Sequence, residues 1–254
     1  MSIMSTLKNL LTGRSRLLAA LTLFLASGAA CAQTVKVMSY NVRHLAGMDN
    51  EINPQRTAAV INVENPDIVM LQELDSVCSR SGRVDQTALL ASLSGMYGIF
   101  GKAIDFEGGG YGIGILSREK PLSVRRIPLP GKEPRLLLIV EFKNFTAACT
   151  HLALEEDCRM QSLEIIREAA SASGKPFVIA GDWNAHPDSP FIQSMRAQFV
   201  INSPQCHTFP ANHPVECIDY IATYAQTPAI TYKASIVNAP SASDHRPVTA
   251  TIAF

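Results

Sequence analysis

The chain has 254 residues with 22 basic and 22 acidic side chains, which gives a formal charge of zero at pH 7. Proteins that follow a DNA backbone usually carry a basic excess, so this balance disfavours a nuclease without excluding one. Apart from a stretch near the N-terminus, no segment is long and apolar enough to cross a bilayer, which excludes a polytopic membrane protein.

The first predicted element is a secretory signal peptide over residues 1–32. Three basic residues precede an apolar stretch from Leu17 to Leu25, and small residues ending in Ala30-Cys31-Ala32 follow. This order is typical of a leader that is removed on export. We expect cleavage after Ala32 and a protein that is periplasmic or secreted. Lipidation of Cys31 is a second alternative, disfavoured because no Leu stands three positions before it.

Residues 33–254 are then expected to form one catalytic domain and to act as a monomer. The leader holds three basic and no acidic residues, so the mature chain has a formal charge of 19 − 22 = −3. Its 222 residues are enough to bury one substantial core.

The mature chain alternates between apolar runs of strand length and amphipathic stretches of helix length. Expected strands are Val35–Tyr40, Ile68–Gln72, Gly112–Ser117, Leu136–Phe142, Phe145–Thr150, Phe177–Ala180, Ile218–Thr223 and Val248–Ala253. Expected helices are Asn53–Asn65, Gln86–Ser94 and Asp157–Ser173. Short connections favour antiparallel pairs, alongside some strand–helix–strand units. The pattern predicts a single α/β domain of two packed sheets flanked by helices.

Five cysteines remain after the leader, an odd number that leaves at least one thiol free or paired between molecules. A disulfide between Cys206 and Cys217 would close a Pro-rich loop, and Cys78 with Cys158 is a weaker pairing. Cys149 lies inside an apolar run and is expected to be a buried free thiol. The absence of a close CxxC spacing disfavours a zinc site.

One motif stands out, Gly181-Asp182-Trp183-Asn184, which follows the apolar run at 176–180. Strand periodicity of two would point Asp182 and Asn184 the same way at the mouth of a buried strand. A turn is the ordinary alternative, because Gly, Asp and Asn are common turn residues.

Other polar residues lie at the ends of similar predicted strands. They are Asn41, Glu73, His151, Asp219, Asp244 and His245. Each alone has an ordinary explanation as a turn or cap residue, a core imidazole, a surface acid or an ion-pair partner. Their recurrence at strand mouths of one architecture favours a shared site.

Seven segments together resemble the endonuclease/exonuclease/phosphatase superfamily. They are SYNVRH (39–44), LQELD (71–75), YGIGILSR (111–118), CTHLAL (149–154), GDWNAHPDSP (181–190), IDYI (218–221) and SDHRPV (243–248). The resemblance implies a DNase-I-like, four-layered α/β sandwich with two mixed or antiparallel sheets. Segments 75–86, 129–135 and 208–214 are similar to a compact secreted bacterial subgroup of metal-dependent hydrolases.

The same resemblance implies a metal site. Glu73 would be the main ligand, helped by Asn41 and Asp244. Oxygen ligands of this kind suit Mg²⁺ or Mn²⁺.

It also implies roles for the residues around the substrate. Asp182 would orient or deprotonate the attacking water, and Asn184 would hold a phosphoryl oxygen. His245, hydrogen-bonded to Asp219, would stabilise the transition state. The last two roles are phosphate contacts: His151 would donate to the phosphate or protonate the leaving oxygen, and Arg135 would bind the phosphate.

Four further residues are candidates for a substrate pocket: Arg43, His44, Arg80 and Tyr111. A structural role explains each of them about as well.

Three functions remain open. The favoured one is an exported phosphoesterase that hydrolyses a phosphodiester of a small molecule or a lipid-derived head group. An extracellular nuclease would use the same residues, with Arg125, Arg126, Lys132 and Arg135 as a basic flank, but aromatic residues for base stacking are scarce. A non-catalytic binding protein on this fold is the least favoured.

Overall fold

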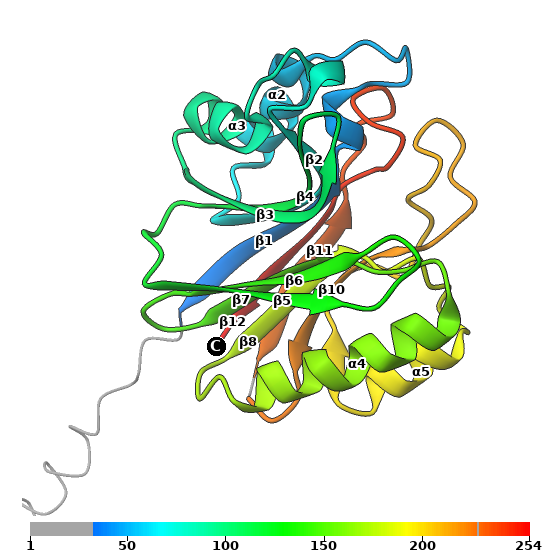
Figure 1. Ribbon diagram of the computed structural model, residues 1–254. Helices are drawn as coiled ribbons and strands as arrows, with labels where there is room; N and C mark the ends of the chain where they lie inside the picture. The colour runs from blue at the N-terminus through cyan, green and yellow to red at the C-terminus, as the bar shows by residue number, and fades with distance from the viewer. Residues whose placement is uncertain (1–32, 228) are drawn as a thin grey trace, which may run out of the picture. The chain divides into compact units, whose positions relative to one another are not determined.

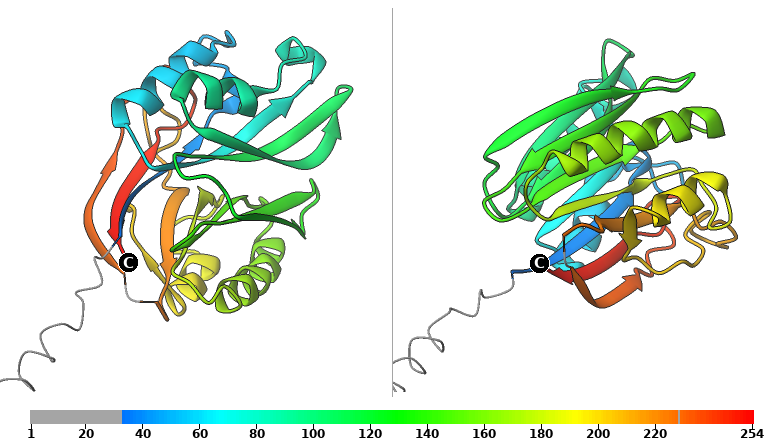
Figure 2. Two further views of the ribbon diagram at one scale, coloured as in Figure 1. Left: turned by 90° about the vertical axis from the view of Figure 1, so that its left-hand side faces the viewer. Right: turned by 90° about the horizontal axis from the view of Figure 1, so that it is seen from below.

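The computed structural model describes residues 33–227 and 229–254, so the expected signal peptide and Cys31 lie outside the described residues. Two six-stranded sheets form the body of this part of the chain. Helices α2 and α3 lie on the outer face of one sheet, and α4 and α5 lie on the outer face of the other (Figures 1 and 2). The predicted four-layered α/β sandwich is confirmed.

The first sheet has the strand order β11-β12-β1-β2-β4-β3. Its strands are β1 (Thr34–Asn41), β2 (Ile68–Ser76), β3 (Tyr97–Phe106), β4 (Gly109–Ser117), β11 (Ile230–Ile236) and β12 (Val248–Ala253). Helix α2 (Pro54–Glu64) joins the parallel pair β1 and β2, and α3 (Gln86–Ser94) precedes β3. Side chains of Asn53 and Asp85 cap the first turns of α2 and α3.

The second sheet has the order β5-β6-β7-β8-β10-β9. Its strands are β5 (Ser123–Leu129), β6 (Arg135–Glu141), β7 (Thr146–His151), β8 (Phe177–Asp182), β9 (Phe199–Ile201) and β10 (Asp219–Tyr224). Helix α4 (Glu156–Ser171) connects the parallel pair β7 and β8, and α5 (Pro190–Arg196) follows β8. The mixture of parallel and antiparallel pairs agrees with the sequence prediction.

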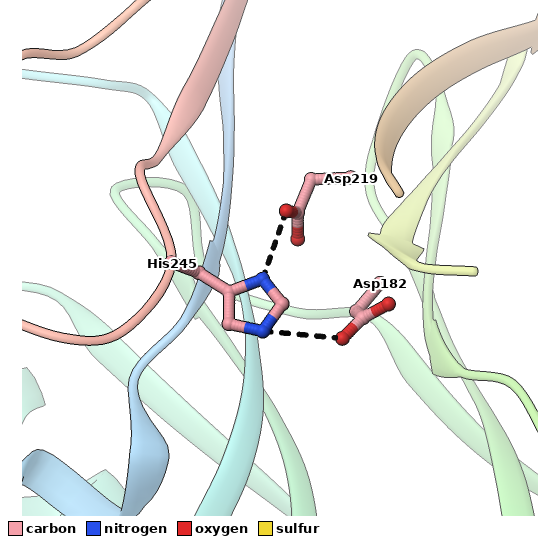
Figure 3. Close-up of side chains that lie close together, drawn as sticks. All are labelled: Asp182, Asp219 and His245. Carbon is pink, nitrogen blue, oxygen red and sulfur yellow. Dashed lines mark hydrogen bonds and ion pairs between the residues drawn. The ribbon is translucent and has the colours of Figure 1, made fainter. Parts of the chain in front are cut away.

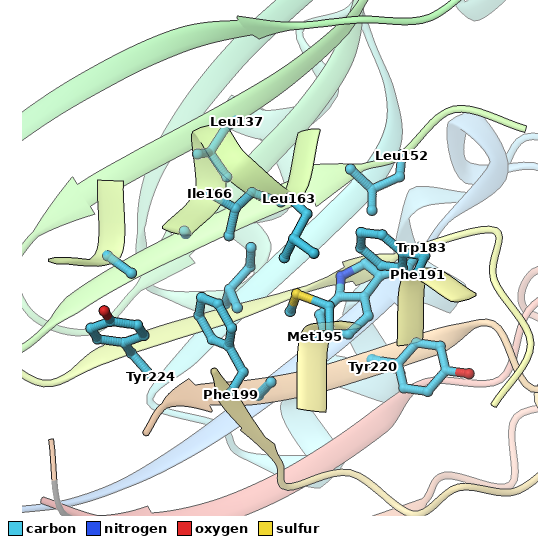
Figure 4. Packing of buried hydrophobic residues seen from close by; sticks show 14 of the residues in the cluster. Leu137, Leu152, Leu163, Ile166, Trp183, Phe191, Met195, Phe199, Tyr220 and Tyr224 are labelled. Carbon is cyan, nitrogen blue, oxygen red and sulfur yellow. The ribbon is translucent and has the colours of Figure 1, made fainter. Parts of the chain in front are cut away.

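Strand alternation explains how each sheet fills two layers. In β1, Val37 belongs to the core between the sheets, whereas the next residue, Met38, packs with the residues under α2 and α3. The second sheet packs in the same way against α4 and α5 through a cluster that contains Trp183 (Figure 4). Trp183 is fully buried, with its ring stacked 4.8 Å from that of Tyr220. This Trp therefore packs in the core.

Several elements were not predicted. They are β3, β5, β9, β11, α5 and the short 3-10 helices Arg43–Leu45 and Ser79–Ser81. The strand β11 shows why such elements escape prediction. Five of its seven residues are exposed. An exposed edge strand has no alternation of apolar and polar residues from which it could be recognised. Within the described chain, no helix is long and apolar enough to span a membrane.

The expected disulfide between Cys78 and Cys158 is wrong. All five described cysteines are free. The buried Cys78 thiol lies 3.2 Å from the carbonyl oxygen of Phe106. Cys158 belongs to α4, on the outer face of the other sheet, so the two thiols cannot meet.

The Cys206–Cys217 disulfide is not formed in the structure either. Cys206 is exposed, whereas the thiol of Cys217 is buried and lies 3.7 Å from the hydroxyl of Tyr220. Cys149 is the buried free thiol that its apolar run predicted, and burial raises its pKa to about 12.

Candidate active site

Three neighbouring strands of the second sheet bring three polar side chains together at one end of the sheet. His151 ends β7 and is in register with Asp182, which ends the parallel strand β8. Asp219 begins β10, which runs antiparallel to β8, and it is in register with Asp182 from the other side. Asp182 is therefore flanked by an imidazole on one side and a carboxylate on the other. Asp219 lies at the start of its strand and not at the end. Because β10 runs antiparallel to β8, Asp219 still lies at the same end of the sheet as Asp182.

The first sheet contributes Asn41 to this group, at the end of β1. The Asn41 amide nitrogen donates to Glu73 Oε1 at 2.9 Å and to Asp182 Oδ2 at 3.1 Å. Both amide protons therefore connect to carboxylates, one from each sheet. Asn41 is fully buried, so its amide joins the two sheets at the base of the site.

Glu73 reaches the site through an irregularity that the sequence did not reveal. The expected strand ended at Gln72, but β2 continues to Ser76 with a break in its register between Leu71 and Leu74. Glu73 lies in this bulge with a φ of 60°. Bulges redirect side chains, and left-handed φ values in residues other than glycine cluster at functional sites.

His245 lies between the two acids of the second sheet (Figure 3). Its Nδ1 atom is 2.9 Å from Asp219 Oδ2, and its Nε2 atom is 3.7 Å from Asp182 Oδ2. The Thr208 hydroxyl donates to the same Asp219 oxygen at 2.6 Å. Asp219 therefore holds one edge of the imidazole while the other edge faces Asp182.

Electrostatics separate the two histidines. Burial opposes the charged form of His245, but Asp219, Asp182 and Asp244 outweigh it and raise the pKa of His245 to about 10. Burial lowers the pKa of His151 to about 4, against the opposing effect of Asp182. His245 is thus a cation at neutral pH, whereas His151 is neutral.

Asp182 is the acid that both histidines face. Its Oδ2 atom is 3.5 Å from His151 Nε2, and the carboxylate is almost fully buried. Burial raises the pKa of Asp182, although His151 and His245 both oppose this shift. A buried carboxylate with a raised pKa is better suited to accept a proton than an exposed one.

Asn184 does not lie on β8. The strand ends at Asp182, and Asn184 has a left-handed φ of 48°. Its backbone nitrogen donates to Asp182 Oδ1 at 3.0 Å, and its side-chain amide donates to the carbonyl oxygen of Leu152 at 2.9 Å. Strand periodicity was therefore the wrong reason to place Asn184 beside Asp182; the turn after the strand places it there.

Glu73 and Asn41 are a suitable oxygen set for a hard divalent cation. In the part of the chain that the structure describes, Glu73 forms no ion pair with Lys, Arg or His. A half-buried carboxylate without a cationic partner, beside an amide, is the chemistry that Mg²⁺ and Mn²⁺ bind. Asp182, Asp219 and His245 also converge within 4.8 Å, but the His245–Asp219 contact is a hydrogen bond that already occupies both groups.

Asp244 lies next to this set rather than in contact with Glu73. The Ser243 hydroxyl lies 2.7 Å from the Asn41 carbonyl oxygen and 3.2 Å from Asp244 Oδ1. Arg43 Nε is 3.5 Å from Asp244 Oδ2. The structure thus joins Arg43 to Asp244, a candidate metal ligand.

The remaining predicted residues lie on the flank of the site. Arg135 begins β6, pairs with Glu133 at 2.8 Å and lowers the pKa of His151 together with the dominant effect of burial. Tyr111 and Arg80 line a neighbouring pocket. His44 lies near Arg80, and its pKa is lowered first by burial and then by that guanidinium.

Sequence reasoning missed Thr208 and Ser243 as supporting residues. Ser243 adjoins the predicted Asp244, so its place in the motif was a usable signal. Thr208 lies 11 residues before Asp219 in an irregular loop, and no periodicity connects the two. Only the folded loop shows that contact.

Comparisons with known proteins agree with this architecture. A family model described as "Endonuclease/Exonuclease/phosphatase family" matches residues 38–245. A search of curated proteins finds no match.

Solved structures share the fold at low sequence identity. A Beutenbergia cavernae endonuclease/exonuclease/phosphatase has a TM-score of 0.72 and 21% identity, covering 87% of this chain and 72% of that one. A Bacteroides vulgatus counterpart has 0.71 and 20%, with 87% and 98% coverage. The Bacteroides thetaiotaomicron mannosyl-6-phosphatase Bt3783 has 0.70 and 17%, with 87% and 100% coverage. These likenesses bear out the DNase-I-like fold, and the family match spans most of the chain. This protein therefore belongs to the endonuclease/exonuclease/phosphatase family.

Proposed function

We propose that this protein is an exported phosphoesterase that depends on Mg²⁺ or Mn²⁺ and hydrolyses a phosphodiester of a small molecule or a lipid-derived head group. The observation that carries the proposal is the convergence of Asn41, His151 and His245 on the buried carboxylate of Asp182. Such a carboxylate, with a raised pKa and donors on several sides, suits the activation of a water molecule.

Each side chain has a task in this scheme. Asp182 orients the attacking water and accepts its proton. His245, held by Asp219 and cationic at neutral pH, stabilises the negative charge that develops on the phosphoryl oxygens. His151 is neutral, so it acts as a hydrogen-bond donor to the phosphate or to the leaving oxygen rather than as a charged acid.

Asn184 and Arg135 complete the phosphate site in this proposal. The Asn184 nitrogen is already used on Leu152, so its side chain would contact the substrate only after a small rearrangement. Arg135 is largely buried and its Nη1 atom lies 2.8 Å from Glu133, so its guanidinium is held in one orientation, in which this proposal gives it a contact with a phosphoryl oxygen.

The metal would be held by Glu73 with Asn41, and Asp244 would complete the set from beside Ser243. When bound, a divalent ion of this kind supplies Lewis-acid polarisation of the phosphoryl group. Asn41 and Glu73 lie on the adjacent strands β1 and β2 with their side chains 2.9 Å apart, and this contact supports the assignment.

A nuclease is the second candidate, and the structure gives it less support. Two of the four residues in the expected basic flank are paired with acids, Lys132 with Glu155 at 3.5 Å and Arg135 with Glu133 at 2.8 Å. Each pair lowers the net positive charge of this flank, and binding to a DNA backbone depends on that net charge. A non-catalytic binding protein is disfavoured because the buried charges around Asp182 would then have no use.

The direct test is hydrolysis of bis(p-nitrophenyl) phosphate by the purified mature protein. We expect turnover with Mg²⁺ or Mn²⁺ and none with excess EDTA. Failure on this and on every other phosphoester with metal present would reject the proposal. Degradation of plasmid DNA at low salt, without turnover of small diesters or lipid head groups, would favour the nuclease.

A further inference from the structure

A cavity lies on the flank of the candidate active site. Its volume is about 160 Å³, and it is lined by Arg80, Ile104, Phe106, Tyr111 and Glu133. Ile104, Phe106 and Tyr111 belong to the sheet that carries Glu73. Tyr111 of β4 is in register with Ile104 of β3. Tyr111 is also in register with Asp75 of β2, two residues after Glu73. One wall residue of the cavity is therefore paired with a residue two positions from the candidate metal ligand.

Two electrostatic effects also link the cavity to the catalytic centre. Burial raises the pKa of Tyr111, and the nearby carboxylates of Glu73 and Glu133 act in the same direction. Glu133 is paired with Arg135, whose guanidinium lies near His151. The cavity wall is thus linked to the flank of the catalytic site through Glu133 and Arg135.

Arg80 is fixed in place by unusually firm contacts. Its Nε and Nη2 atoms bind the two oxygens of Asp75 at 2.8 and 2.7 Å, and Asp75 is fully buried. The guanidinium carbon lies 4.5 Å from the centre of the Phe106 ring and 5.4 Å from that of Tyr111. An arginine held in this way is a rigid donor, because little side-chain entropy remains to be lost on binding.

The charges of the cavity cancel. The carboxylate of Asp75 balances Arg80, and Arg135 balances Glu133. A second phosphate or another polyanion would meet no uncompensated positive charge here, and a free cation would meet no uncompensated carboxylate. The cavity therefore suits a neutral group.

Hydrogen-bonding groups remain available on the wall. Among the described residues, neither the Arg80 Nη1 atom nor the Tyr111 hydroxyl has a hydrogen-bond partner. Glu133 is exposed and offers its second oxygen as an acceptor. Donors, an acceptor and an apolar wall formed by Ile104 and Phe106 match a ring that carries hydroxyl groups on its edge and C–H groups on its face.

We propose that this cavity binds a neutral polyhydroxylated ring, a sugar or a cyclitol, as the ester group of the phosphodiester that the enzyme hydrolyses. The inference rests on the proposed function for the identity of the substrate. Binding of the ring itself does not require turnover, and the two claims can therefore fail separately.

The experiment measures binding of unphosphorylated rings to the mature protein in EDTA by ligand-observed saturation-transfer NMR. The probes are methyl α-glucoside and myo-inositol, with adenosine and choline as representatives of other head groups. We expect saturation transfer to the two polyols in the unaltered protein. Stronger transfer to adenosine or choline than to either polyol would overturn the proposal.

Two matched substitutions localise the binding. Ile104→Arg places a long charged side chain in the cavity, and Ile230→Arg makes the same change on β11, at the opposite edge of the same sheet. We expect polyol transfer to disappear with Ile104→Arg and to persist with Ile230→Arg. Equal transfer in both variants would overturn the proposal. Tyr111→Phe, which keeps the ring and removes one hydroxyl, should weaken polyol binding by about tenfold, and no change would count against the proposal.

Kinetics then separate the cavity from the catalytic chemistry. We compare kcat/KM for p-nitrophenyl diesters whose other ester group is either myo-inositol or methyl, so that the leaving group is the same. The unaltered enzyme should prefer the inositol diester by about tenfold or more, and Ile104→Arg should abolish that preference. Absence of the preference in the unaltered enzyme overturns the inference, whereas absence of any hydrolysis rejects the proposed function instead.

Discussion

Thr208 and His245 share one oxygen of Asp219. The Thr208 hydroxyl lies 2.6 Å from Asp219 Oδ2, and His245 Nδ1 lies 2.9 Å from the same atom. The other oxygen of Asp219 is buried and has no hydrogen-bond partner among the described residues. The position of this carboxylate, and with it the position of the imidazole, therefore depends on two contacts.

The first prediction concerns that dependence. Thr208→Val preserves the shape of the side chain and removes its donor, so Asp219 should lose about 2 kcal/mol of charge-assisted hydrogen bonding. We expect kcat/KM for an aryl phosphodiester to fall by roughly thirtyfold, because the orientation of His245 is less well fixed. Thr208→Ser restores the hydroxyl and should recover most of the activity. Equal activity in the Val and Ser variants would show that Thr208 only fills space.

A second prediction tests the metal ligand. Glu73→Gln keeps the size of the side chain and removes its charge, which should weaken Mn²⁺ binding by tenfold or more, as measured by calorimetry. Asp244→Asn should have a smaller effect, since Asp244 contacts Ser243 and Arg43 instead of Glu73. Glu51→Gln, on an exposed loop, is the control and should bind Mn²⁺ normally. Undiminished affinity in Glu73→Gln would assign the metal to other residues.

The third prediction is a dependence of stability on pH. Burial lowers the pKa of His151 from 6.5 to about 4 in the folded protein. Between these values the unfolded chain binds the proton more readily, so stability from this group is present above pH 6.5 and is lost as pH falls towards 4. At about 1.4 kcal/mol per pH unit, the loss is roughly 3 kcal/mol.

Denaturant unfolding in EDTA measures this loss without any contribution from metal. Between pH 7 and 4, the free energy of unfolding should fall more in the unaltered protein than in His151→Gln. Asp182 and His245 face His151 in the unaltered protein and remain in the variant, so their own titration largely cancels in the comparison. Parallel curves for the two proteins would mean that His151 is not held neutral by the fold.

Much of the fold followed from residue patterns. The apolar runs that became β1, β8 and β12 were recognisable because their strands are buried on both faces. Asn53 and Asn65 bounded α2 as cap residues, as their types suggest. The exposed edge strand β11 has no such pattern, and its existence depends on pairing with β12, which is distant from any local signal.

The site was partly predictable for a similar reason. Polar residues that follow buried strands are conspicuous, which singled out His151 and Asp182. The sequence could not show that Glu73 lies in a bulge, because a register break depends on the partner strand β4. Nor could the sequence show that Arg80 is held beside Asp75, because the rings that pack against Arg80 come from the distant strands β3 and β4.

The most direct test of the central claim is a comparison of Asp182→Asn with Asp188→Asn. Asp182 is buried among His151, His245 and Asn41, whereas Asp188 is exposed a few residues later in the same connection. Both proteins are assayed on bis(p-nitrophenyl) phosphate with saturating Mn²⁺, after circular dichroism has shown that both are folded. We predict that kcat falls by about a thousandfold or more in Asp182→Asn and stays unchanged in Asp188→Asn. Retention of full kcat by a folded Asp182→Asn protein would contradict the assignment of Asp182 as the residue that activates water.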